Sequence, residues 1–558
     1  MDGSTDLRPF LVPGASNEEA SDADHLKSRL TSVDWRGRPS VFSNRRLGGR
    51  ITMPFIAGSL CLGYIGLFGI FFNLVFFFQE VFDQGSGIAA SSTNNCVGST
   101  FLSGLLGAFI AESFLGRLWT CTLFQGIATV GFALMMISTY VVLSAEQLTG
   151  TMVVFFYIFI YIVAIGSGVP MSILQALGAD QFDSEKDKST FFTWCLISTS
   201  AGAFLADTVV VYAVSSKGWF IGFGVASIFG AAGLILFASG IPLYRHYRHQ
   251  VLIAAARKCR IKVPTNSDDL YQEVQHEQGC TQLIEHTDDL RWLDKAATVL
   301  PCDNKDGRVR NVWKLSTVTE VEEMKALLRL IPIWTSGILY NTIYSQSSTL
   351  LVEEGALMDL SIAGSVSMQP ATMNLFNLLV AVFVDPLYNA VVVPLARSIT
   401  GLPHGLSSLH RIGIGCLTSS VAMMLAGALE FYRLHCFKQG LPPISIFCQI
   451  PVYFMLGLAQ FLACIGLSEF LYSYAPLSLR SFGTSLSCAC GALGLYVSSL
   501  LVWIVTLVTA RGEAAGWIPA DLNDGHLDYF FWLLGGLGFL NFFWFIGCST
   551  VVRHQSSC

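Results

Sequence analysis

Charged residues are scarce in this chain of 558 residues. Asp, Glu, Lys and Arg make up 13% of it and hydrophobic residues 53%, whereas a typical soluble protein is about 25% charged. The mean hydropathy is +0.55. A chain this apolar is not expected to fold as a set of soluble domains in water, so its place is a lipid bilayer.

Patterns that carry enzyme chemistry are also missing. The fifteen cysteines fall mostly within apolar runs, and no set of Cys and His has the spacing of a metal site. Neither a nucleophile beside a base nor a glycine-rich phosphate loop is recognisable. We therefore expect no enzyme activity, no metal, no cofactor and no nucleic-acid partner.

The first fifty residues lack an apolar core, although they hold eight Lys or Arg. A cleaved signal peptide needs an apolar run of about 7 to 15 residues, and this segment has none. Residues 1–50 are expected to form a cytosolic tail and not a signal or transit sequence.

Long apolar runs are what the chain has instead. A helix needs about 20 apolar residues to cross a bilayer, and such runs recur from Ile51 onward. Six spans are predicted before a long charged segment and six after it. Their ranges are 51–78, 94–111, 118–143, 152–176, 191–214 and 219–243, then 324–352, 373–393, 412–429, 444–471, 479–508 and 529–552. The predicted fold class is an all-α membrane protein of twelve transmembrane helices.

Lys and Arg are distributed unevenly over the predicted loops. With both termini in the cytosol, all but four of the 33 lie on the inner side or at inner helix ends, the exceptions being Lys217, Arg433, Lys438 and Arg511. This bias is the one that the positive-inside rule describes. The predicted organisation is a cytosolic tail (1–50), a six-helix bundle (51–243), a cytosolic linker (244–323), a second six-helix bundle (324–552) and a short cytosolic tail (553–558).

Two glycines flank an acid and a base between the second and third predicted helices. The segment runs from Gly107 through Glu112 to Gly116 and Arg117. It resembles the signature loop of the major facilitator superfamily, in which a tight cytosolic turn carries one acidic and one basic residue.

A second motif follows the fourth predicted helix. Its residues are Gly178, Ala179, Asp180, Gln181, Phe182 and Asp183, and Phe191 to Trp194 open the next helix. Further matches, such as Arg411 to Gly415 and Glu469 to Tyr472, extend over residues 35–552. Together they resemble the plant nitrate/peptide transporter family, which belongs to the proton-dependent oligopeptide transporters.

The resemblance implies a major facilitator fold of two six-helix bundles that works by alternating access. It also implies a central substrate cavity and transport that is usually driven by a proton gradient. Substrates in the family include nitrate, short peptides, plant hormones and specialised metabolites, so membership does not identify the cargo.

Several charges of the family pattern are absent from this sequence. The family usually carries Glu-x-x-Glu-Arg on the first helix, where this chain has Leu60, Gly63 and Tyr64. A Lys or Arg on the fourth helix is replaced by Met171, and the His of the nitrate-transporting pattern is replaced by Tyr344. A proton-coupling group on the first helix and a cationic anchor for an anion are therefore both missing.

Carboxylates remain elsewhere in the predicted spans. An acid inside a bilayer costs about 2.5 to 3.5 kcal/mol on insertion scales, which makes each one a functional candidate. Glu469 matches a family position that faces the cavity, although its usual basic partners are absent, and Asp207 is a second candidate for proton coupling. Asp385 precedes Pro386 near a helix end, where solvation at the interface is the simpler interpretation.

The inferred cavity is aromatic, apolar and weakly acidic. Its predicted substrate-binding residues are Tyr64, Phe68, Asn73, Tyr344, Gln346 and Glu469, with Phe72 and Trp334 at its boundary. Without a cation, an anion would lose its hydration with little compensation. For each aromatic residue, helix packing remains an alternative role.

The expected function is transport of a small organic solute or nitrate, with proton coupling weakened or lost. One alternative is a proton-coupled nitrate or peptide symporter, and another is a receptor of the same fold that does not transport. A monomer in the bilayer is expected by analogy. The plasma membrane and the vacuolar membrane both remain open.

Overall fold

The computed structural model describes residues 48–182, 184–245, 294, 318–363, 366–388, 391, 394–395, 398, 407–474, 480–510 and 516–555. The predicted N-terminal tail and linker lie almost entirely outside these residues, as does Asp183 of the second motif. All long elements within them are helices.

The first half of the chain forms the helices of the predicted N-terminal bundle. They are α2 (Met53–Phe82), α3 (Ser86–Ile110), α4 (Arg117–Ser144), α5 (Gly150–Ala179), α6 (Glu185–Leu205), α7 (Val211–Lys217) and α8 (Trp219–Gly240). A 3-10 turn, η2 (Arg50–Thr52), precedes α2 and another, η5 (Ile241–Leu243), follows α8. Two π-helical turns, η3 (Ala111–Leu115) and η4 (Ala206–Val210), continue α3 and join α6 to α7.

The second half begins at α10 (Val318–Leu328). It continues with α11 (Ile331–Tyr344), η8 (Ser345–Ser348), α12 (Leu350–Ala356), the strands β1 (Ser361–Ala363) and β2 (Val366–Ser367), η9 (Pro370–Met373), α13 (Asn374–Leu387) and α15 (Ser408–Lys438). The last elements are η11 (Ile446–Gln449), α16 (Ile450–Ala459), the π-helical η12 (Gln460–Ile465), α17 (Gly466–Tyr474), α18 (Arg480–Thr509), η14 (Leu522–Asp524) and α19 (Leu527–Gln555).

Nine helices among the described residues are long and apolar enough to cross a membrane. They correspond to nine of the predicted spans, and the other three spans coincide with α3, the α11 to α12 segment and α13. The α11 to α12 segment is broken by the 3-10 turn η8 and α13 has only 14 residues, so neither is one helix of spanning length among the described residues. Helix α3 is long enough but contains Ser, Thr and Asn, which lower its hydropathy. The predicted all-α membrane class is confirmed.

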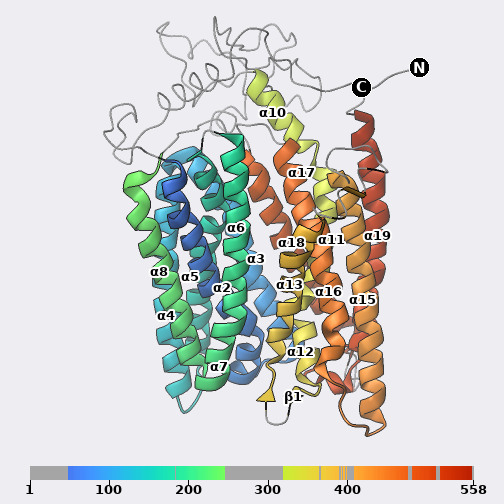
Figure 1. Cartoon of the computed structure of the whole chain (residues 1–558). Coiled ribbons are helices and arrows are strands. Elements are labelled where there is room, and N and C mark those ends of the chain that lie inside the picture. Colours follow the sequence, from blue (N-terminus) through green and yellow to red (C-terminus); the bar gives the residue numbers. More distant parts are fainter. Residues whose placement is uncertain are drawn as a thin grey trace, which may run out of the picture.

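The helices stand side by side in two groups (Figure 1). The first half, blue to green, occupies one side and α11 to α19, yellow to red, the other, with α3 packed along α18 where the groups meet. We call the end that carries α7, α12 and β1 the outer end, and the end that carries α10 the inner end. These names follow the orientation that the Lys and Arg distribution predicts.

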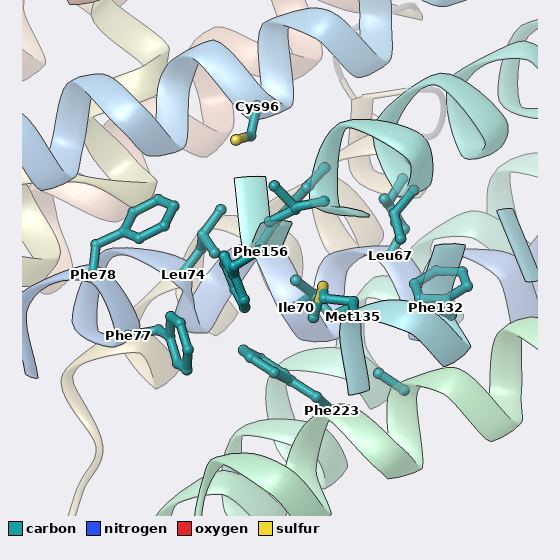
Figure 2. Close-up of a cluster of buried hydrophobic side chains, with 14 of the residues drawn as sticks. Leu67, Ile70, Leu74, Phe77, Phe78, Cys96, Phe132, Met135, Phe156 and Phe223 are labelled. Atoms are coloured by element: carbon teal, nitrogen blue, oxygen red, sulfur yellow. The ribbon is translucent and has the colours of Figure 1, made fainter. Parts of the chain in front are cut away.

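The core of the first half is built from aromatic rings (Figure 2). Phe77 of α2 stacks on Phe156 of α5, with ring centroids 4.7 Å apart, and lies 5.4 Å from the ring of Phe223 on α8. All three side chains are fully buried. Offset and edge-on aromatic pairs favour such spacings, so α2 is fixed at the centre of its group.

Glycine permits the closest helix approach in this half. A Cβ placed on Gly168 of α5 would lie 1.8 Å from the carbonyl oxygen of Thr100 on α3. Small residues let helix backbones approach closely where lipid provides no hydrophobic drive for association. The contact between α3 and α5 therefore depends on the absence of a side chain at this position.

Helix α3 starts eight residues before the predicted span 94–111, at Ser86. The sequence around Ser91 to Asn94 is too polar to be recognised as lipid-facing. These residues face α18 instead, because Asn94 Nδ2 donates to Ser498 Oγ at 3.2 Å and Ser499 Oγ donates to the Ser91 carbonyl at 3.1 Å. A polar helix segment can lie within a bilayer when its partners are on another helix.

Candidate functional site

The positions that lack the family's charges meet in one small cavity inside the first half. Leu60, Gly63, Tyr64 and Met171 are among its lining residues, and its volume is about 50 Å³. A Cβ on Gly63 would meet nothing within 4 Å. The cavity therefore has room for a side chain at the position where the family carries its second glutamate.

Neutral side chains supply the polarity of this cavity. Ser59 and Gln125 line it, and Gln125 Nε2 donates to Ser59 Oγ at 3.0 Å. Its lining residues come from α2, α4, α5 and α8 and include no Asp, Glu, Lys, Arg or His. A charge on α2 at this point would have no compensating partner in the cavity.

The predicted aromatic residues of α2 form a ladder. The Tyr64 and Phe68 ring centroids are 5.2 Å apart, and the Phe68 and Phe72 centroids are 5.5 Å apart. Phe68 and Phe72 pack in a cluster with Val352 and Ala371, which belong to the second half. The ladder therefore runs along the junction of the two halves.

Tyr344 is the centre of a neutral hydrogen-bond network in the second half. Its hydroxyl donates to Gln460 Oε1 at 2.8 Å and accepts from Asn377 Nδ2 at 2.8 Å. Asn377 is fully buried, and Gln460 opens the π-helical turn η12. The sequence analysis did not single out Gln460 or Asn377, although an amide within an apolar run is a signal that both share.

Gln346 is bonded to the contact between the halves. Its Nε2 donates to Ser498 Oγ at 2.9 Å, and that hydroxyl also accepts from Asn94 Nδ2 on α3. The Gln346 Oε1 atom is buried and has no hydrogen-bond partner among the described residues. Gln346 is thus partly committed to holding α11 and η8 against α18.

Asn73 is fully buried on α2. Its Nδ2 donates to the Gly69 carbonyl at 2.9 Å, while its Oδ1 has no hydrogen-bond partner among the described residues. Trp334, placed at the cavity boundary from the sequence, donates from Nε1 to the Leu486 carbonyl at 2.7 Å. Its indole is thereby tied to α18, within the second half.

Asp207 lies in the π-helical turn η4 and is 1% exposed. Neither of its carboxyl oxygens has a hydrogen-bond partner among the described residues. Its neighbours Ala206 and Val211 pack against Val352 and Ala371 of the second half. π-Helical turns occur often at functional sites, and this one places a carboxyl group without a described partner beside the junction.

Glu469 has a basic partner, Arg411, which is not one of the family charges whose absence the sequence indicated. The Arg411 Nη1 atom lies 2.6 Å from Glu469 Oε2, and the Glu469 side chain is 50% exposed. The Arg411 guanidinium also lies over the rings of Tyr388 and Phe461, about 5 Å from their centroids. The partner comes from the start of α15, which no spacing in the sequence indicates.

The side chain of Asp385 lies outside the part of the chain that the structure describes.

The two inner-end motifs meet each other. Arg117 Nη1 lies 2.7 Å from Asp180 Oδ2, which joins the start of α4 to the end of α5. Gln181 Nε2 donates to the Leu177 carbonyl and to the Arg245 carbonyl, and its Oε1 accepts from the Arg245 backbone N–H. These contacts bind the two motifs to the end of α8. The side chain of Glu112, the acid of the first motif, is not among those that the structure describes.

Both motifs have glycine at positions where a side chain would be strained or would clash. Gly116 has φ +78°, a conformation that L side chains rarely adopt. A Cβ on Gly107 would lie 2.4 Å from Val169, and one on Gly178 would lie 2.0 Å from the Phe191 ring. Phe182 packs 5.5 Å from the same ring. The residues of these motifs thus act in packing and turn formation at the inner end.

An acidic cluster at the outer end escaped the sequence analysis. Arg433 binds both carboxyl oxygens of Glu430, at 2.6 and 2.7 Å, and both side chains are buried. Glu354 is buried beside Glu430 and accepts a hydrogen bond from Gln449 Nε2 at 3.2 Å. These residues lie on α12, α15 and η11, all within the second half.

Cations are confined to the ends of the described helices. Helices α2, α3, α5, α8, α11, α13 and α16 contain no Lys or Arg, and in α15 these residues lie in the first turn (Arg411) and in the last two turns (Arg433 and Lys438). Within the described residues, no group of three or more His, Cys, Asp or Glu could hold a metal ion. The junction of the halves therefore combines aromatic rings, amides and carboxyl groups.

Comparison with known proteins matches this arrangement. A model named PTR2, of the POT family, matches residues 118–518. Protein NRT1/PTR FAMILY 8.3 of Arabidopsis thaliana is 35% identical over 568 aligned residues, covering 96% of this chain and 96% of that protein. Protein NRT1/PTR FAMILY 8.5 of the same plant is 36% identical over 538 residues, covering 91% of this chain and 90% of that protein.

Solved structures share the fold at low identity. The POT family transporter PepTSo superposes with a TM-score of 0.68 at 16% identity, over 91% of this chain and 99% of that one. A POT family transporter in complex with a thioalcohol-conjugated peptide gives 0.63 at 13% identity, over 90% and 96% of the two chains. The helix arrangement is therefore shared by all three.

Proposed function

Because this chain belongs to the POT family and is a multi-pass membrane transporter, we propose that it carries a neutral or cationic small organic solute. Transport is by alternating access of the two halves, with proton coupling weakened or lost. The proposed substrate-binding side chains are Tyr64, Phe68, Asn73, Tyr344, Gln346 and Glu469, at the junction or on the inner surface of the second half.

The observation that carries this proposal is an excess of hydrogen-bond acceptors without donors. Asn73 Oδ1, Gln346 Oε1 and both oxygens of Asp207 are buried and have no hydrogen-bond partner among the described residues. A buried acceptor without a donor costs about 1 to 3 kcal/mol. A solute with N–H or O–H groups would relieve that cost, whereas nitrate or a free carboxylate would add further acceptors.

The missing family charges support the same solute class. Leu60, Gly63, Tyr64 and Met171 line a cavity without charge, and the Tyr344 network is neutral. An anion bound beside these described residues would have no guanidinium or ammonium partner among them to offset its desolvation. A solute with a positive charge would instead meet the carboxyl group of Asp207.

Proton-coupled symport of nitrate or a peptide remains the second candidate. The observation that favours it is the retention of two carboxyl groups, Asp207 and Glu469, as proton-coupling candidates. Of the two, Asp207 has the stronger case, because Glu469 pairs with Arg411 inside its own half. An unpaired carboxyl at the junction changes its surroundings when the halves move, which a coupling group requires.

Uptake by expressing cells tests the two candidates. Nitrate, a dipeptide, neutral hormones and amine metabolites are offered at two external pH values with matched membrane potential. The proposal expects uptake of a neutral or amine compound with a shallow pH dependence, and a several-fold loss in Asp207→Asn for a cationic solute. Steep acid-stimulated uptake of nitrate or dipeptide would overturn it in favour of symport, and ligand binding without flux would select a receptor.

The membrane in which the chain works is tested in the same cells. A fluorescent fusion expressed in plant cells distinguishes the plasma membrane from the vacuolar membrane, which are the two proposed locations. Import across the plasma membrane would raise the solute content of the cell, whereas export from the vacuole would lower the solute content of the vacuole. We propose a monomer as the working unit, and native mass determination of the purified protein in lipid tests that.

A further inference from the structure

Glu353 lies at the outer end of α12, where the second half meets the first. Its side chain is 3% exposed, and neither carboxyl oxygen has a hydrogen-bond partner among the described residues. The polar groups beside it, Gln79 and Ser86, belong to the first half. The carboxyl group of Glu353 is therefore enclosed by a contact between the halves.

The two neighbouring polar groups are neutral, and each can hydrogen-bond to the Glu353 carboxyl group as well as to other atoms. Gln79 Nε2 donates to Ser86 Oγ at 3.1 Å, and Ser86 Oγ donates to the carbonyl of Ala520 at 3.3 Å. Ala520 lies between α18 and α19, so this chain of hydrogen bonds crosses from the first half to the second. Glu353 faces a closed outer contact that is built from neutral groups.

Charged groups around Glu353 do not compensate for a negative charge on it. Helix α3 and the turns η8 and η9 pack against α12 and contain no Asp, Glu, Lys, Arg or His. Glu80 at the end of α2 and Asp83 after it are exposed. Both are acidic, so the first half offers acids and amides but no cation at this point of the described chain.

The charges on the second half are occupied elsewhere. Glu354 adjoins Glu430, whose carboxyl binds Arg433 through both oxygens. Asp528 is buried and lies 3.7 Å from the His526 ring. Among the described residues, Asp207 on η4 is the other buried carboxyl group at the junction, and as a carboxylate it would carry the same sign as Glu353.

Opening of the outer end would change the surroundings of Glu353 more than those of its neighbours. Alternating access separates one half from the other around the central site. Gln79 and Ser86 would move away with the first half, and water would reach the carboxyl group. Glu354, Glu430 and Arg433 belong to one half and would keep their contacts. A carboxylate is favoured in water, and its protonated form is favoured when it is buried without a partner.

We propose that Glu353 is a proton-binding site that controls closure of the outer end. The carboxylate takes one proton from the outer solution, an O–H bond forms, and the neutral group can then be buried between the halves. When the outer end opens, the same proton returns to the outer solution. This inference rests on the proposed transport function and adds the regulation of its outer gate.

The position of the site makes this control kinetic and not a source of driving force. The proton enters and leaves on the outer side, so no proton crosses the membrane with each cycle. External acid would change how often the outer end closes, and so the rate of transport. It would not change the solute ratio that transport reaches at equilibrium.

The test measures the outer opening directly, without any solute. Spin labels are placed at Ser216→Cys on α7 and Lys438→Cys on α15, both exposed at the outer end. The background carries Ser at Cys448, the exposed cysteine of the described residues, and at Cys259, Cys280, Cys302 and Cys558. The label-to-label distance distribution is recorded in lipid nanodiscs at pH 5.5 and 7.5.

The wild-type background is expected to shift toward the short, closed distance at pH 5.5. One titrating group changes the closed-to-open ratio by at most about tenfold for each pH unit. Glu353→Gln, which stays neutral, should give the closed distance at both pH values. Glu353→Asp, which still titrates, should keep a pH-dependent shift and shows that the site tolerates substitution.

Two matched controls separate this site from other acids of the outer end. Glu354→Gln removes the adjacent buried carboxyl, which stays within the second half. Asp359→Asn removes an exposed carboxyl whose pKa is held below its ordinary value by hydrogen bonds from the Ser361 backbone N–H and hydroxyl. Asp359 therefore stays ionised at both pH values. Both controls should keep the wild-type shift.

The outcomes bear separately on the two proposals. A pH-independent distance in the wild-type background, or an unchanged shift in Glu353→Gln, would overturn the role of Glu353 whatever solute the protein carries. Accumulation of a solute from the panel above its equilibrium ratio, driven by an imposed pH gradient and kept in both Asp207→Asn and Glu469→Gln, would show that the proton crosses the membrane at Glu353 and would overturn kinetic control. Acid-stimulated nitrate uptake that persists in Glu353→Gln would overturn the proposed solute class alone.

Discussion

The guanidinium of Arg411 and the carboxylate of Glu469 lie 2.6 Å apart at the inner end of the second half. Arg411 opens α15 and Glu469 lies on α17, so the pair joins two helices of the same half. Rigid-body motion of the halves would leave this pair intact. A role for Glu469 in proton coupling would require the Arg411 contact to break during the cycle.

Removing either member of this pair is expected to cost little stability. Glu469→Gln and Arg411→Gln should each lower the melting temperature slightly, and the double variant should lose less than the sum. The half-exposed carboxylate is screened by solvent, so the coupling should be about 0.2 to 1 kcal/mol. Thermal unfolding in detergent measures it. A loss of pH-dependent uptake in Glu469→Gln but not in Arg411→Gln would instead establish Glu469 as the coupling group.

Tyr344→Phe is expected to weaken solute uptake. The change removes the hydroxyl that joins Gln460 to Asn377, so Gln460 Oε1 loses its donor and Asn377 Nδ2 keeps its bond to Asn374 Oδ1 alone. A lost hydrogen bond costs about 1 kcal/mol, which corresponds to roughly a fivefold rise in KM. The matched control is Tyr340→Phe, because the buried Tyr340 hydroxyl has no described hydrogen-bond partner and should be dispensable. Equal effects of both changes would refute a specific role for the network.

Gly168→Ala should be strongly destabilising. The new methyl group would meet the Thr100 carbonyl oxygen at 1.8 Å and would force α3 and α5 apart. Overpacking of this kind costs about 1 to 3 kcal/mol or more. Gly126→Ala on α4 is the control, since its Cβ would meet nothing within 4 Å. The measurement is the yield of monodisperse protein and its melting temperature, and similar values for both variants would contradict the packing argument.

The side chain of Gly63→Glu should fit the cavity sterically, but its negative charge should lower the stability of the fold. The new Cβ meets no atom within 4 Å and opens onto a cavity without a cation. The unfolded chain ionises a Glu above about pH 4.3, while the cavity favours the neutral acid, so stability should fall as pH rises by at most 1.4 kcal/mol for each pH unit. Melting temperatures from pH 5 to 8 are compared with those of Gly63→Gln, which should show no such trend. A rise of stability with pH would indicate a cation near this position.

Several parts of the fold could be anticipated because they depend on hydropathy and charge summed over segments of the chain. Apolar runs locate most spans, and the Lys and Arg bias predicts their orientation. The start of α3 was placed too late, since Ser91 to Asn94 are polar and their partners are on α18. Hydropathy cannot distinguish a polar segment that faces another helix from one that ends in water.

Parts of the site were anticipated and others were not. The absence of charge at Leu60, Gly63, Tyr64 and Met171 was visible from the resemblance, and the structure brings these residues to one cavity. Gln460 and Asn377 were missed because each is a single amide in an apolar run. The importance of Tyr344 becomes clear only from the atoms that its hydroxyl contacts.

By itself, the sequence determined the membrane class, the two sets of helices and the absence of the family charges. Those properties follow from transfer free energies and side-chain identities that hold wherever a residue lies. Only the tertiary structure decided that Glu469 pairs with Arg411 and that Asp207 and Glu353 have no hydrogen-bond partner among the described residues. The physical reason is that a charge in a bilayer is governed by groups within a few ångströms of it, and those groups come from distant parts of the chain.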